Sequence, residues 1–170
     1  MKKFLKWLGI SLATLLVAIV LFLFGMRFHD GPLEIISGGP FKTGEAATAP
    51  GDWSYLADRP TIQFQTLDPA RSRTVWLGVY QGRLFVVSGY MTTGYGKIWK
   101  QWPHYIVEND DRIILRIDGN LYQQRLQRIT GGPIAAAVME VFGQKYNLGA
   151  GADDIPVTSG DVWMFEVLDR

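Results

Sequence analysis

The chain has 170 residues, no cysteine and a formal net charge of +1. The near-neutral charge gives no indication of a nucleic-acid partner, and the lack of cysteine excludes a disulfide framework, a thiolate nucleophile and a cysteine metal site. The two histidines, His29 and His104, are far apart in the sequence, so we expect no metal site. The length allows one membrane helix and one domain of roughly 120 residues.

An uncharged segment, residues 7–26, follows three lysines near the N-terminus. As a helix it would be about 30 Å long, the thickness of a bilayer core, so the lipid bilayer is the first predicted partner. Short basic segments stay in the cytoplasm. We therefore predict a single-pass protein of the inner membrane, with its N-terminus inside and its domain on the periplasmic or outer side. The alternative is a cleaved signal peptide, but the apolar run is too long and no small-residue cleavage site follows it.

The chain divides into a transmembrane anchor (residues 1–26), a linker (27–51) and a domain (52–170). The linker is rich in Gly, Pro, Ala and Thr, which disfavour helix and sheet. Some of its side chains are apolar enough to pack against the domain. These residues are Leu33, Ile35, Ile36 and Phe41.

The domain alternates strand patterns with turns. Alternating or β-branched and aromatic segments predict six strands, at residues 61–66, 74–80, 83–88, 112–118, 121–129 and 161–168. Short helices are predicted at 53–57 and 97–102, and a longer one at 133–146. Tight turns at Gly82 and Gly119 indicate antiparallel hairpins. The predicted fold is mainly β, a six-stranded antiparallel barrel with short helices, because a closed barrel leaves few exposed edges.

Several segments between residues 71 and 168 follow one another in a familiar order. They are 72–77 (Ser-Arg-Thr-Val-Trp-Leu), 82–88 (Gly-Arg-Leu-Phe-Val-Val-Ser), 97–99 (Lys-Ile-Trp), 111–119 (Asp-Arg-Ile-Ile-Leu-Arg-Ile-Asp-Gly) and 122–125 (Tyr-Gln-Gln-Arg), with Lys145 and Tyr146 near the end of the last helix. This order resembles the split-barrel flavin-binding superfamily, which includes pyridoxamine phosphate oxidases and deazaflavin-dependent nitroreductases. The resemblance implies a homodimer with FMN, or a related flavin or deazaflavin, in the cleft between the subunits.

The resemblance also implies binding residues. Basic side chains and hydroxyls hold the flavin phosphate in that superfamily, and they correspond here to Arg73, Ser88 and Lys97, with Arg125 facing the cleft from the next hairpin. Such donors suit a doubly charged phosphate. The aromatic residues that would flank the isoalloxazine are Trp76, Tyr90, Trp99 and Trp102. No catalytic residue is assigned, because the cofactor would supply the reactivity of such an oxidoreductase.

The alternative hypothesis is a non-enzymatic module that has kept the barrel, lost the cofactor and binds an envelope protein or a lipid. The Ser-Arg-Lys trio of the oxidases is missing at residues 92–97, and the domain is expected outside the cytoplasm, where free flavin is not the usual redox carrier. The basic residues would then be solvated or bridge a dimer, and the tryptophans would belong to the core or to an interface. An open pocket lined by Arg73, Lys97 and Arg125 favours binding, whereas a cleft filled by Trp99 or Trp102 favours the module.

Overall fold

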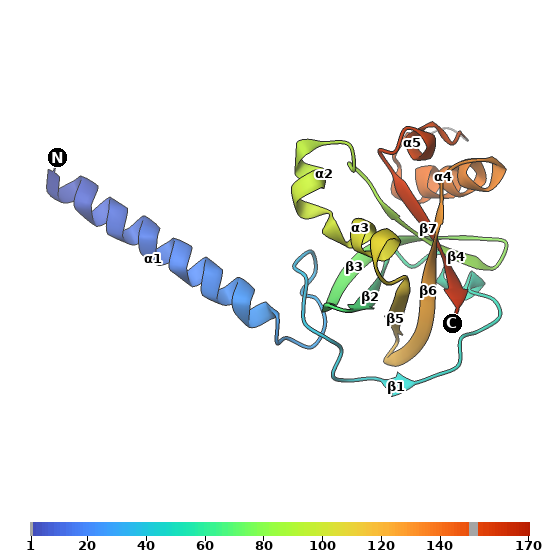
Figure 1. Cartoon of the computed structure of the whole chain (residues 1–170), viewed down its shortest axis with the longest axis horizontal. Helices are drawn as coiled ribbons and strands as arrows, with labels where there is room; N and C mark the ends of the chain where they lie inside the picture. The colour runs from blue at the N-terminus through green and yellow to red at the C-terminus, as the bar shows by residue number, and fades with distance from the viewer. Residues whose placement is uncertain (1, 150–152) are drawn as a thin grey trace.

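The computed structural model describes residues 2–149 and 153–170. Helix α1 (Lys2–Met26) projects away from a compact β domain (Figure 1). Its length and apolar composition suffice to cross a membrane, and its side chains from Lys2 to Gly25 are exposed. The hydroxyl of Thr14 donates to the carbonyl of Ile10 at 2.9 Å. This hydroxyl is therefore satisfied within the helix, as a lipid environment requires.

Six strands close into an antiparallel barrel, which confirms the predicted fold class. They are β2 (Thr61–Leu67), β3 (Ala70–Tyr80), β4 (Arg83–Ser88), β5 (Arg112–Ile117), β6 (Asn120–Ile129) and β7 (Trp163–Asp169). Around the barrel the order is β2-β3-β4-β7-β6-β5, and β5 closes it by pairing with β2. A short strand, β1 (Glu45–Ala46), adds to β6 in parallel.

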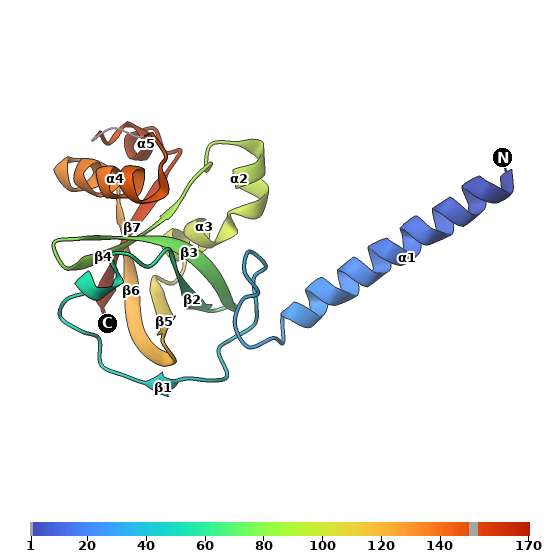
Figure 2. The same cartoon turned by 180° about the vertical axis from the view of Figure 1, so that it is seen from behind.

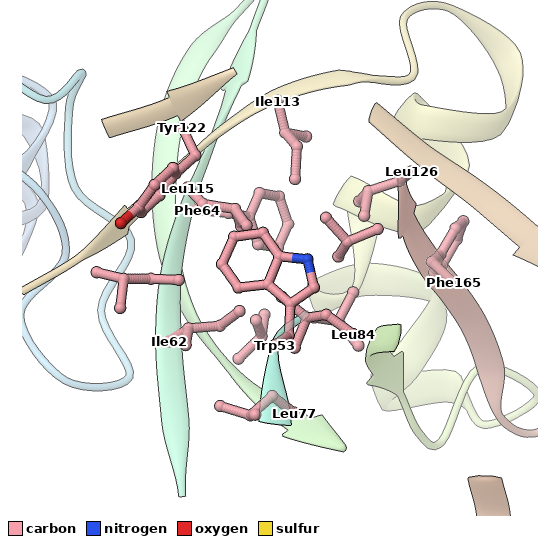
Figure 3. Packing of buried hydrophobic residues seen from close by; sticks show 14 of the residues in the cluster. Trp53, Ile62, Phe64, Leu77, Leu84, Ile113, Leu115, Tyr122, Leu126 and Phe165 are labelled. Carbon is pink, nitrogen blue, oxygen red and sulfur yellow. The ribbon is translucent and has the colours of Figure 1, made fainter. Parts of the chain in front are cut away.

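The barrel interior is a hydrophobic core formed by alternate residues of each strand (Figure 3). Trp53 enters it from the end where β3 turns into β4, immediately before a 3-10 helix, η1 (Ser54–Leu56). Its backbone N–H donates to the carbonyl of Gly82 at 2.8 Å, and its ring lies edge-on to Tyr122. One end of the barrel is thus filled by a side chain from outside the strands.

Helices cover the other openings and one outer face of the barrel. Helices α2 (Gly94–Trp99) and α3 (Gln101–Glu108) join β4 to β5, α4 (Pro133–Tyr146) packs on the outside of β3, and α5 (Ile155–Thr158) precedes β7. The single helix predicted at 97–102 is in fact two, which meet at Lys100. Pro103 lies in the first turn of α3, where its missing N–H is not needed.

The predicted linker is folded against the barrel. Gly38 exchanges two backbone hydrogen bonds with Ser72 of β3, at 3.0 and 3.2 Å. Asp30 forms an ion pair with Arg116 of β5 at 2.8 Å, and the Arg116 guanidinium lies 4.3 Å from the ring centroid of Phe41. Phe41 therefore packs against the domain as expected.

Two other linker residues do not. Leu33 and Ile35 are exposed, in a tight turn closed by backbone hydrogen bonds between Leu33 and Ile36. The expectation that they pack on the domain was wrong, because the turn points their side chains into solvent.

Candidate functional site

Strands β3 and β4 pair only next to the turn that joins them. Their pairing runs from Tyr80–Arg83 to Leu77–Val86 and stops there. Arg73 lies beyond that point on β3. The edge of β3 freed in this way takes the backbone bonds from Gly38 of the linker. This is the end of the barrel opposite Trp53, and the α2–α3 segment covers it (Figure 1).

Trp102 of α3 fills this second end of the barrel. Its side chain is 6% exposed, and its ring centroid lies 5.0 Å from that of Phe64 and 5.3 Å from that of Phe165. Both phenylalanines are fully buried core residues. Two tryptophans, Trp53 and Trp102, thus close the barrel from its two ends and leave no room for a planar cofactor ring in the interior.

Arg73 points inward beside this plug. Its guanidinium carbon lies 5.5 Å from the ring centroid of Phe64 and 5.9 Å from that of Trp102. Its Nε is inaccessible to solvent, and within residues 2–149 and 153–170 it has no hydrogen-bond partner. Burial, followed by repulsion from Arg71, lowers the pKa of Arg73 to about 10. A buried guanidinium nitrogen without a hydrogen-bond partner costs stability, so an anion that accepts from it would be favoured here.

Two more unpartnered donors belong to the same end of the barrel. The hydroxyl of Ser88 is buried, and the Nε of Arg128 on β6 is likewise solvent-inaccessible; neither has a hydrogen-bond partner in the described part of the chain. Ser88 pairs through its backbone with Trp163 of β7, and the guanidinium of Arg128 lies 3.6 Å from the Trp163 ring centroid. Both donors are therefore linked to the same indole.

Positive charge accumulates here without compensation. Within the described residues, none of the cations at this end forms an ion pair with a carboxylate. Burial, and then repulsion from Arg73, lowers the pKa of Lys100; burial lowers that of Arg128. We call this region the cationic end. Its members are Arg71, Arg73, Ser88, Lys100 and Arg128.

The other residues expected at a cofactor site are distributed around the barrel. Tyr90 and Trp99 are exposed near the cationic end, on the loop after β4 and on α2, as is Lys97. Trp76 faces outward from β3 and stacks on Tyr146 of α4, with ring centroids 4.5 Å apart.

Arg125 also faces outward, where it lies 3.9 Å from Asp111 and donates to the carbonyl of Asp169. Within one barrel, therefore, the structure brings Arg73 and Ser88 to the same end and places Trp76 and Arg125 elsewhere.

Sequence reasoning missed Arg71 and Arg128. The signal was present in the alternation of β6, where Tyr122, Gln124 and Leu126 face inward, so that Arg128 has the same parity. This parity did not make Arg128 a predicted site residue, because an arginine at a strand end is most often solvated.

A cavity of about 640 Å³ lies on the outer side of β2, and no residue of the cationic end lines it. Its two arginines are already paired with carboxylates: Arg116 with Asp30, and Arg59 with Asp118. The contrast emphasises how unusual the unpaired cations at the cationic end are.

Comparisons with known proteins add little to this geometry. No family model matches the chain, and no curated protein matches it. Among solved structures, an F420 reductase is similar, with a TM-score of 0.41 and 14% sequence identity over 72% of this chain and 96% of that one. A likeness at this level carries no functional argument, so the function has to be inferred from the barrel itself.

Proposed function

We propose that this protein is held at a membrane by α1 and binds a phosphate-bearing ligand at the cationic end of its barrel. The observation that carries the proposal is the buried Nε of Arg73, which has no hydrogen-bond partner among the described residues. A phosphate oxygen would supply its partner. The hydroxyl of Ser88 and the Nε of Arg128 are two more buried donors at the same end that have no partner among residues 2–149 and 153–170.

A flavin or deazaflavin nucleotide is the specific ligand that we propose. Its phosphate fits the donor set of the cationic end. Its ring does not fit inside the barrel, because Trp102 fills that space, so the ring would lie outside, against the exposed aromatic residues Tyr90 and Trp99. When bound, such a cofactor supplies hydride or electron transfer, and the residues of this chain bind and orient it.

The arrangement in the cell follows from the charges around α1. Lys2, Lys3 and Lys6 precede its apolar segment and Arg27 follows it, so we propose that the N-terminus is cytoplasmic and that the barrel lies on the outer side of the inner membrane. A homodimer, in which the outward-facing Arg125 would contribute to the site of a second copy, is part of the same proposal.

Titration of FMN into full-length protein in lipid nanodiscs tests the proposal, with quenching of FMN fluorescence as the readout and inorganic phosphate as competitor. Arg73→Met should weaken FMN binding at least about tenfold, since a hydrogen bond to a charged group contributes about 1.5–3 kcal/mol. Arg59→Asn, which removes an arginine that is paired with Asp118 outside the cationic end, is the control and should have a smaller effect. The proposal fails if FMN does not bind, or if phosphate does not compete with it.

One observation favours a second candidate, a non-enzymatic interaction module. Trp102 fills the end of the barrel that carries Arg73, and a cleft filled by this residue favours the module. Detergent extraction of the full-length protein from its own membranes would then recover a stoichiometric protein partner and no phosphate-bearing molecule. Recovery of a partner-free protein with a bound nucleotide would overturn this candidate.

A further inference from the structure

Exposed apolar side chains gather on two segments that are far apart in the sequence. Ile98 of α2 is 80% exposed and Ile35 of the linker turn is 87% exposed. Several exposed apolar side chains on one side of a protein mark an interaction surface. We call the whole set the docking surface. Its members are Leu33, Ile35, Tyr95, Ile98 and Trp99.

The docking surface lies on the side of the barrel from which α1 projects. Both views of the molecule place α2 and the blue linker turn on that side (Figure 1, Figure 2). Backbone hydrogen bonds trace the same path. The N–H of Gly39 donates to the carbonyl of His29 at 3.1 Å, three residues after the end of α1, and Gly38 pairs with Ser72, which lies between Arg71 and Arg73 on β3. The carbonyl of Arg27 also lies against Gly39, where a Cβ would come within 2.3 Å of it. The end of α1 is therefore fixed to the end of the barrel that carries α2.

The composition of this surface suits a lipid headgroup region. Tyr95 and Trp99 stack on each other, with ring centroids 6.3 Å apart, and such amphipathic rings favour the membrane interface. Residues 89–107 include Lys97 and Lys100 but no Asp or Glu. A segment of this charge is attracted to anionic lipids.

We infer that the docking surface inserts into the outer headgroup region of the bilayer that α1 spans, as a second membrane contact beside the helix. The inference rests on α1 being a membrane span and goes beyond the proposed ligand binding. Two contacts fix the tilt of the barrel where a single helix would leave it free to rotate. The cationic end then faces the headgroup layer, and its ligand enters along the membrane surface.

The absence of cysteine makes a direct test simple, because any introduced cysteine is unique. Ile98→Cys, Ala57→Cys and Leu15→Cys would each be labelled with an environment-sensitive fluorophore in the full-length protein. The labelled proteins would be reconstituted into vesicles of phosphatidylcholine and phosphatidylglycerol that carry a nitroxide either near the headgroup or near the middle of the acyl chain. Ala57 is exposed next to η1, on a part of the barrel remote from α1, and serves as the matched control.

The inference predicts that the label at residue 98 is quenched several-fold more by the shallow nitroxide than the label at residue 57, and is protected from a water-soluble quencher. Equal responses at 98 and 57 would overturn it. The label at residue 15 reports on the anchor separately, since strong quenching there by the deep nitroxide shows that α1 spans the bilayer. A quenched residue 15 with an unquenched residue 98 therefore refutes the docking surface alone, whereas an unquenched residue 15 refutes the membrane anchor as well.

Discussion

The guanidinium of Arg73 lies 5.9 Å from the ring centroid of Trp102, and the two side chains together close the end of the barrel where β3 and β4 part. Trp102 supplies an aromatic face to a cation that has no carboxylate partner in the described chain. The residue that fills this end of the barrel, Trp102, thus contacts the arginine of the proposed ligand site, Arg73. Separate mutations of the two residues test what each contributes.

Replacement of Arg73 by methionine should change the stability of the ligand-free protein little, or raise it. The buried charge has an unsatisfied Nε, and methionine keeps most of the apolar stem, so the free energy of unfolding should stay within about 1 kcal/mol of wild type or rise. Chemical unfolding of the full-length protein in detergent measures it.

Arg83→Met is the matched control. Arg83 makes two hydrogen bonds of 2.6 Å to the buried carboxylate of Glu166, and its loss should cost about 1–3 kcal/mol. An Arg73 variant destabilised as much as the Arg83 variant would mean that Arg73 serves the fold rather than a ligand.

Trp102→Ala should be among the most destabilising substitutions in the chain. Truncation of a buried tryptophan that packs between Phe64 and Phe165 leaves a large cavity, with an expected cost of about 3–5 kcal/mol. Trp99→Ala, in the same segment but 60% exposed, should cost less than about 0.5 kcal/mol in detergent. Comparison of the midpoints of thermal unfolding of the two variants tests whether Trp102 fills the end of the barrel. Similar midpoints would contradict that role.

Tyr146→Phe tests how α4 completes the barrel. Strand β2 begins at Thr61, and the preceding residue, Pro60, has no N–H. Leu77 of β3 therefore pairs with Val86 of β4 on one side but has no strand partner on the β2 side. The Tyr146 hydroxyl takes that place: it accepts from the N–H of Leu77 at 3.0 Å and lies 2.7 Å from the carbonyl of Pro60. Removal of the hydroxyl should cost about 1–3 kcal/mol and speed hydrogen exchange at Leu77. Unchanged exchange at Leu77 would contradict this assignment.

Acid should release the linker before it unfolds the barrel. Burial alone would raise the pKa of Asp30, but hydrogen bonds from Lys42 and Thr43 and the charge of Arg116 outweigh it and lower that pKa to about 2. The pKa of an aspartate in the unfolded chain is about 3.9, so the folded state binds fewer protons between this pH and about pH 2. The stabilisation that the ionised Asp30 gives to the folded state is therefore complete above about pH 4 and is lost as the pH falls to about 2.

The expected contribution is only about 1 kcal/mol, because the carboxylate is partly exposed. Thermal unfolding of wild type and Asp30→Asn in detergent should differ at neutral pH and converge as the pH falls through this window. Asp58→Asn, at an exposed carboxylate, is the control. A difference between wild type and Asp30→Asn that persists unchanged below about pH 2 would disprove the linkage.

Much of the fold could be predicted from local patterns. The uncharged run predicts α1. The turns at Gly82 and Gly119 predict two hairpins, and these two glycines adopt positive φ angles in the structure. The start of β3 was less accessible, because Arg71, Ser72 and Arg73 read as polar. They are strand residues only because β2 and Gly38 of the linker pair with them from both sides.

The candidate site could be predicted only in part. The resemblance to split-barrel flavin-binding proteins predicted Arg73 and Ser88 as site residues, and the structure brings both to one end of the barrel. That the Nε of Arg73 has no partner among the described residues is a property of its surroundings, which are Trp102 and cations from other elements, and no local sequence pattern predicts it. The ion pair of Asp30 with Arg116, which joins residues far apart in the chain, was inaccessible for the same reason.

The most direct test of the central claim is to isolate the full-length protein from its own host, denature it and identify by mass spectrometry what it releases. We expect wild type to release a phosphate-bearing small molecule in an amount comparable to the protein, and Arg73→Met, purified in parallel, to release far less of it. A wild-type protein that releases no more of any such molecule than the Arg73 variant would contradict the account.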